Sequence, residues 1–73
     1  MTTEIFSLWG RQRGWLSQRN GKYQVSAVIG EHGIWYISTD PKRLERAFYS
    51  ACRRMLLRRL LPFLTPPPAR LSI

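Results

Sequence analysis

The sequence predicts an α+β protein in which a three-stranded antiparallel sheet packs against one C-terminal helix, followed by an extended, proline-rich tail. Three observations support this fold class: strand-like alternation between residues 13 and 39, an Asn20-Gly21 dipeptide, and apolar residues at helical spacing after Pro41. A chain of 73 residues has room for one small core. We therefore expect a single domain over residues 1–61 and a tail over residues 62–73.

The first strands are expected on either side of a tight turn. Residues 1–10 have weak strand character and are expected to form a strand or an arm, and a short strand is expected over residues 13–17. Asn20-Gly21 is a strong hairpin signal, because both turn positions tolerate a positive φ. After this turn the apolar residues alternate, which predicts a strand with one buried face; they are Tyr23, Val25, Ala27 and Ile29.

A second turn over residues 30–33 and a third strand over residues 34–39 complete the predicted sheet. Trp35 and Tyr36 are neighbours on this strand and therefore point to opposite faces. We expect one of the two rings in the core and the other exposed or in contact with a partner.

The helix is expected to begin at Pro41, with Thr39 or Asp40 as its N-cap. Its apolar stripe consists of Leu44, Ala47, Phe48, Ala51, Cys52 and Met55. An ideal helix would turn Arg58 and Arg59 onto this stripe. The helix is therefore expected to bend or end near Leu57, unless this turn leaves the core to meet another surface.

The positive charge is concentrated on the expected helix. Residues 41–61 hold seven basic residues and one acid, and they carry most of the net charge of +8. The near-neutral first half has an acid-free block from Arg11 to Lys22, interleaved with aromatic residues. Two basic surfaces on so small a chain indicate an anionic partner, and nucleic acid fits best.

We predict a small, basic, non-catalytic nucleic-acid-binding module, with DNA favoured over RNA. The expected contacts are Arg11, Arg13, Trp15, Arg19, Lys22, Arg43, Arg46, Arg53 and Arg54. The alternative interpretation of both basic blocks is that they are solvated faces of a hairpin and a helix.

A second function class is an adaptor or inhibitor of phage or plasmid type, which would bind an acidic surface or the nucleic-acid channel of a host protein. The expected partner-binding residues are Arg58, Arg59, Leu60, Leu61, Phe63 and Leu64. The proline-rich tail would then dock in a partner's groove, or it is a disordered end. Attachment to an anionic membrane is a third class; it is disfavoured because Leu44, Phe48 and Met55 are needed to cover the sheet.

The sequence offers little material for catalysis or for metal binding. It has four acids, one histidine and one cysteine, and we expect no enzyme activity, no metal and no cofactor. His32 lies in an expected turn without a second ligand, and Cys52 lies on the apolar stripe as a buried thiol. A single cysteine forms no disulfide within the chain, and the N-terminus shows no secretory pattern, so the expected location is the cytoplasm.

Four short motifs resemble the plant ethylene-response-factor type of DNA-binding domain and the similar arm-binding domains of phage integrases. The motifs are Arg13-Gly14, Gly21-Lys22-Tyr23, Tyr36-Ile37-Ser38-Thr39 and Ala47-Phe48-Tyr49-Ser50-Ala51. The resemblance implies that three antiparallel strands lie in the DNA major groove with one helix behind them. It assigns a DNA contact to Arg13, whereas Leu16 and Gln18 stand where that family carries further arginines.

Overall fold

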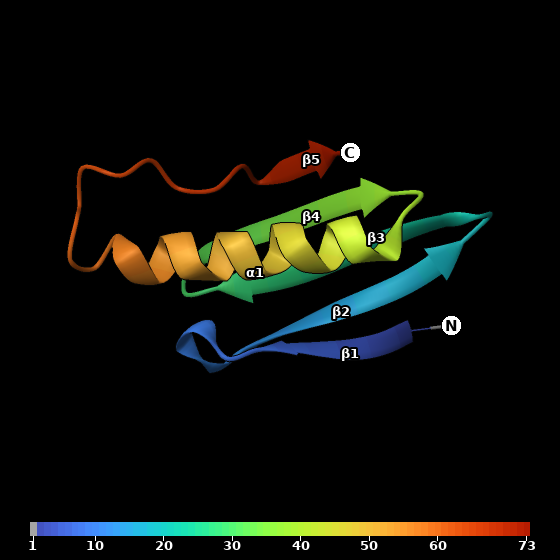
Figure 1. Cartoon of the computed structure of the whole chain (residues 1–73), viewed down its shortest axis with the longest axis horizontal. Coiled ribbons are helices and arrows are strands. Elements are labelled where there is room, and N and C mark those ends of the chain that lie inside the picture. The colour runs from blue at the N-terminus through green and yellow to red at the C-terminus, as the bar shows by residue number, and fades with distance from the viewer. Residues whose placement is uncertain (1) are drawn as a thin grey trace.

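One helix covers one face of a five-stranded sheet in the computed structural model of the chain, which describes residues 2–73 (Figure 1). The elements, in chain order, are β1 (Thr2–Ser7), the 3₁₀ turn η1 (Trp9–Arg11), β2 (Gln12–Arg19), β3 (Lys22–Ile29), β4 (His32–Ser38), α1 (Pro41–Leu57) and β5 (Arg70–Ser72). The first four strands form an antiparallel meander, and β5 joins β4 in parallel. The predicted α+β class, with a sheet and one helix, is confirmed.

The expected count of three strands is wrong, because β1 and β5 add one strand at each edge of the sheet. In the first ten residues, β1 pairs along its whole length with β2, but Ile5 is its only buried apolar residue, so its alternation is weak. Residues 70–72, expected in the extended tail, pair with β4 through Leu71 and its neighbours. A parallel neighbour needs a long crossover, and α1 with the segment after it supplies one.

The turns follow the sequence signals. Asn20 has a φ of 53° and Gly21 a φ of 75°, so the two-residue turn between β2 and β3 has positive φ at both positions. This geometry matches the right-handed twist of the flanking strands. The turn between β3 and β4 is shorter than expected, since only Gly30 and Glu31 lie outside the strands.

The core lies between α1 and one face of the sheet. Of the alternating residues of β3, Val25, Ala27 and Ile29 are buried there as predicted and Tyr23 is partly buried; Tyr36 is the core member of the Trp35–Tyr36 pair. From the helix, Leu44 and Phe48 are completely buried and Ala51 and Cys52 nearly so. The predicted apolar stripe is therefore the packing surface of α1.

Both ends of α1 are explained by local interactions. The backbone N–H of Lys42 donates to Asp40 Oδ1 at 3.0 Å, which makes Asp40 the N-cap. The helix ends at Leu57, and two shorter turns follow, with Arg59 N–H donating to Leu56 O and Leu60 N–H to Leu57 O. The predicted end of the helix near Leu57 is therefore confirmed, and Arg58 and Arg59 lie in the turns that follow it.

The segment after α1 packs against the domain along much of its length. Arg54 donates from Nε to Thr65 O at 2.6 Å and from Nη2 to Thr65 Oγ1 at 3.0 Å, and Arg58 Nε donates to Leu64 O at 2.8 Å. On β4, the hydroxyl of Tyr36 donates to Pro68 O at 2.8 Å. These contacts lead the chain along α1 and into β5.

Gly14 leaves the space that the helix needs against β2. A Cβ at this position would lie 2.9 Å from Phe48 Cε1, closer than ordinary contacts allow. We expect Gly14→Ala to lower the free energy of unfolding by about 1–3 kcal/mol, because the completely buried Phe48 ring must shift. Urea unfolding followed by circular dichroism measures the change. Gly33→Ala is the matched control, because a Cβ there meets no atom within 4 Å; equal losses in both variants would contradict the account.

Arg54 and Arg58, at the C-terminal end of α1, are expected to hold β5 in place through their hydrogen bonds to the segment before it. In the double variant Arg54→Ala/Arg58→Ala, the amides of Trp35 and Ile73 should exchange hydrogen faster, because they donate to Ala69 O and Ile37 O along β5. Hydrogen exchange followed by NMR checks this. The charge-matched control, Arg46→Ala/Arg53→Ala, removes exposed arginines and should leave these two amides unchanged. Unchanged exchange in the first variant would show that the arginines do not hold the strand.

Candidate nucleic-acid interface

The sheet face opposite α1 is covered by no other element within residues 2–73. Because side chains alternate along a strand, every second residue points to this side. We call this surface the open face; it comprises Thr2, Glu4, Phe6, Arg13, Trp15, Ser17, Arg19, Lys22, Gln24, Ser26, Val28, Gly33, Trp35, Ile37, Arg70 and Ser72. Four of the predicted nucleic-acid contacts, Arg13, Trp15, Arg19 and Lys22, therefore lie on one surface.

The centre of the open face is aromatic and apolar. The exposed fraction is 50% for Trp15 and 43% for Trp35, and Phe6 and Val28 are also exposed. Large apolar side chains such as these are more often buried in the core than exposed. They form an accessible apolar area on the uncovered side of the sheet.

One row of side chains crosses all five strands at this centre. The strand register places Glu4, Trp15, Ser26, Trp35 and Arg70 beside one another in that order. The indole N–H of Trp35 donates to Gln24 Oε1 at 3.1 Å, and the Arg70 guanidinium carbon lies 5.8 Å from the centre of the Trp35 ring. These contacts orient the Trp35 ring and place the positive charge of Arg70 next to it.

Basic residues surround the aromatic centre. Arg19 and Lys22 face each other at the end of the β2–β3 hairpin, and Arg70 lies at the opposite side of the sheet. Glu4 is the only acid in the strands, and its Oε1 lies 3.3 Å from Arg13 Nε in an exposed ion pair. The open face is therefore positive, with one acid that offsets Arg13.

Sequence reasoning missed part of this surface. The sequence predicts that one of Trp35 and Tyr36 is exposed but does not identify which, and it places Arg70 in the tail. Phe6 was part of the weak N-terminal segment. Only the position of β5 beside β4 brings Arg70 onto the open face, and a three-residue strand leaves no periodic signal.

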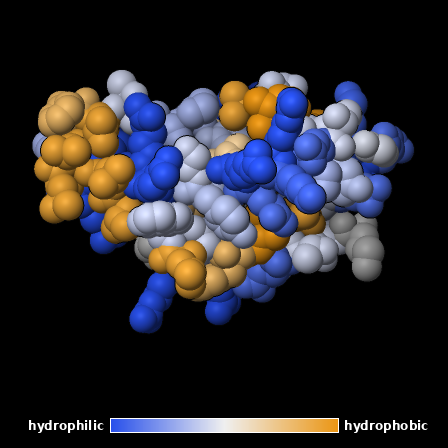
Figure 2. All heavy atoms as spheres, in the orientation of Figure 1, coloured by the Kyte–Doolittle hydropathy of each residue, from blue (hydrophilic) through white to orange (hydrophobic). Residues whose placement is uncertain are grey.

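The helix arginines lie on the other side of the molecule. Figure 2 views the protein from the helix side and shows hydrophilic side chains gathered over α1. Arg43, Arg46 and Arg53 are exposed there, so a ligand on the open face could reach them only around an edge of the sheet. Arg54 is engaged with the segment after the helix, and Arg11 lies in η1 outside the sheet.

An apolar patch lies at the C-terminal end of α1, seen at the left of Figure 2. Leu60 and Phe63 are 80% and 77% exposed, and Leu57 and Leu61 are also exposed. Of the other predicted partner-binding residues, Arg59 is exposed, Leu64 is partly buried, and Arg58 donates to Leu64 O. The predicted apolar residues thus gather at one end of the molecule.

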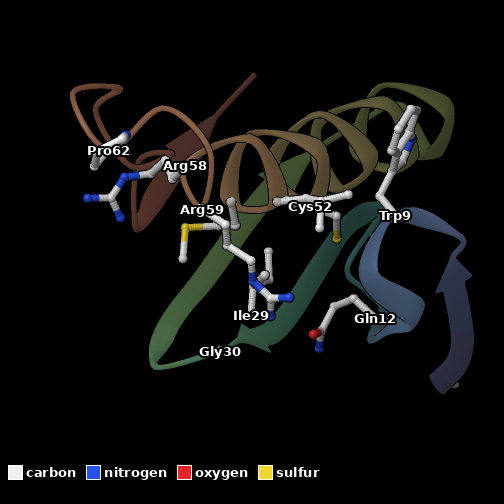
Figure 3. Close-up of a pocket in the computed structure, with 10 residues that line it drawn as sticks. Trp9, Gln12, Ile29, Gly30, Cys52, Arg58, Arg59 and Pro62 are labelled. Atoms are coloured by element: carbon white, nitrogen blue, oxygen red, sulfur yellow. The ribbon is translucent and has the colours of Figure 1, made fainter.

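A hollow of about 330 Å³ lies near this end, between η1, the β3–β4 turn and α1 (Figure 3). Trp9 and Arg59 border it on opposite sides, and the sulfur of Cys52 points toward it. The last turn of α1 also borders it, and the negative end of the helix dipole there disfavours an anion. Arg58 and Arg59 also line the hollow, so positive charge and the negative end of the helix dipole oppose each other there.

The residues with chemical reactivity do not form a cluster. Cys52 is buried as predicted, and this burial raises the pKa of its thiol, while a hydrogen bond with Ser7 opposes the shift. His32 Nε2 donates to Pro67 O at 2.7 Å and helps to hold the segment before β5. Within residues 2–73, no group of three metal-ligating side chains gathers, and no helix in that range is long and apolar enough to cross a membrane.

Comparisons of this chain with family models, with curated proteins and with solved structures gave no match. The resemblance to the ethylene-response-factor type of domain therefore stays a prediction.

Proposed function

We propose that this protein is a small, non-catalytic nucleic-acid-binding module and that the open face is its binding surface, with DNA favoured over RNA. The observation that carries the proposal is the combination, on one uncovered sheet face, of exposed tryptophans with a basic surround. Basic side chains bind phosphates, and aromatic rings pack against bases and sugars.

The charge balance supports an anionic partner. The chain has twelve basic residues and four acids, and three of the acids lie outside the strands. A positive surface of this kind raises the local concentration of a polyanion and speeds association. Within this proposal, the exposed arginines on the outer side of α1 strengthen long-range attraction, while the open face makes the direct contacts.

A second candidate function is binding of another protein through the end of α1. The observation that favours it is the exposure of Leu60 and Phe63, together with Leu57 and Leu61, beside Arg59. Apolar side chains gathered in this way mark protein interfaces. A phage- or plasmid-type adaptor or inhibitor would use this patch, and the binding experiment below separates the two functions.

Charge reversal on the open face should weaken nucleic-acid binding more than the same reversal on the helix. We expect Arg13→Glu/Lys22→Glu to lower affinity for DNA at least about tenfold and to flatten its salt dependence, because phosphate contacts release counterions. Fluorescence anisotropy between about 50 and 200 mM salt measures both quantities. Arg43→Glu/Arg46→Glu makes the same charge change on α1 and serves as the control.

Three outcomes would redirect the proposal. A larger loss from the helix variant would move the binding surface to α1. Equal losses would mean that total charge alone attracts the ligand. If the wild-type protein bound no nucleic acid at the lowest salt, the protein-binding function at the end of α1 would be favoured.

Removal of the acid on the open face should strengthen binding. We expect Glu4→Gln to raise affinity for DNA severalfold at low salt, because it frees Arg13 from its ion pair and removes repulsion of phosphates. The same anisotropy titration measures the gain. Glu45→Gln removes one acid from α1 and is the matched control. If Glu4→Gln gained no more than this control, Arg13 would not contact the nucleic acid.

A further inference from the structure

The open face has a particular arrangement of aromatic and small side chains that narrows the class of ligand. Trp15 and Trp35 lie on strands separated only by β3, so their backbones are about 10 Å apart. Between them, β3 contributes Ser26, whose side chain is small. The two indoles therefore border a shallow hollow that has Ser26 at its floor.

The hollow extends to the part of the sheet where β2 and β3 are no longer paired, since Gln12 and Val28 line it. The β2–β3 pairing extends only as far as Trp15 and Ser26, and Gln12 Nε2 donates to Val28 O at 2.6 Å beyond this point. Arg13 and Arg70 also line the hollow, one on each side. An opening with aromatic walls and a guanidinium at each side accommodates a flat ring attached to an anionic backbone.

The Trp35 ring is preorganised by its contacts within the protein. Its indole N–H donates to Gln24 Oε1 on β3, and the Arg70 guanidinium of β5 lies over its ring, so contacts from both neighbouring strands limit how the ring can move. An aromatic ring that is already fixed loses little conformational entropy when a ligand stacks on it.

The centre of the face is poorly suited to reading paired bases. Groove readout of a duplex depends on hydrogen-bonding side chains at base edges, as with arginine on guanine or asparagine on adenine. Here the central positions hold Trp15, Val28 and Trp35, while the basic residues lie around them. Aromatic rings at the centre of a positive sheet face are the arrangement that binds unpaired bases.

We propose that the open face binds single-stranded nucleic acid, with unpaired bases stacked on Trp15 and Trp35 and the backbone held by Arg13, Arg19, Lys22 and Arg70. This inference rests on the proposed function and specifies the form of its ligand. DNA and RNA single strands share the chemistry of stacking, so both are included as separate arms of the test.

The test compares wild-type protein with Trp15→Ala, Trp35→Ala and Trp9→Ala on fluorescently labelled oligonucleotides of about 12 nucleotides. Each variant is titrated with oligo-dT, with oligo-U and with a mixed-sequence duplex. The wild type should prefer the single strands. Trp15→Ala and Trp35→Ala should each lose at least about tenfold in affinity for them, with little change for the duplex. Trp9 is similarly exposed but lies in η1, so Trp9→Ala should lose nothing.

A second measurement does not depend on the stability of the alanine variants. Trp9→Phe leaves only Trp15 and Trp35 as indole fluorophores, since the chain has three tryptophans. Stacking with bases should then quench most of the remaining emission as oligo-dT or oligo-U is added, and the two arms show which strand is preferred.

The outcomes separate this inference from the proposed function. Base stacking would be overturned if the wild type preferred the duplex. It would also be overturned if single strands bound without quenching and neither Trp15→Ala nor Trp35→Ala lost affinity for them. Either result would leave the protein a nucleic-acid-binding module. Absence of binding to every oligonucleotide at low salt would overturn both.

Discussion

The fold depends on the packing of a single helix against one face of the sheet. Phe48 is completely buried, and its ring lies where a side chain on Gly14 would otherwise stand. Because α1 is the only helix within residues 2–73, it can cover one face and no more. The buried residues of β3 and β4 face α1, whereas Val28 and Trp35 of the same two strands lie on the uncovered face and stay exposed. The candidate binding surface is thus a direct result of how the core is built.

The same packing distributes the positive charge over two opposite sides of the molecule. Arginines on the outer side of α1 and basic residues on the open face point in opposite directions, with the core between them. Arg54, in the last turn of α1, and Arg58, directly after it, donate to carbonyl groups of the following segment. A count of charges along the sequence therefore overstates how many of them one ligand can contact. What distinguishes the open face is its tryptophans, because both sides of the molecule are basic.

Local signals predicted much of the structure. The Asn20-Gly21 turn, the alternation in β3, the Asp40 cap and the apolar stripe of α1 all depend on neighbouring residues and are confirmed. The edge strands were missed for a different reason. Ile5 is the only buried apolar residue of β1, and Leu71 is the only apolar member of β5, so neither gives a period that can be detected. The same limit applied to the site: Arg13 and Trp15 could be named from their basic and aromatic block, whereas Arg70 joins them only through long-range pairing of β5.

The attachment of β5 also has a kinetic consequence. The meander from β1 to β4 is joined by short turns, so its pairings form between residues that are close in sequence and should assemble early. Strand β5 can pair with β4 only after the intervening chain, including all of α1, has been closed into a loop, and this costs configurational entropy. With three residues it gains few hydrogen bonds in return. The native protein should therefore open and close at this edge many times for each global unfolding event, and each opening would carry Arg70 away from Trp35.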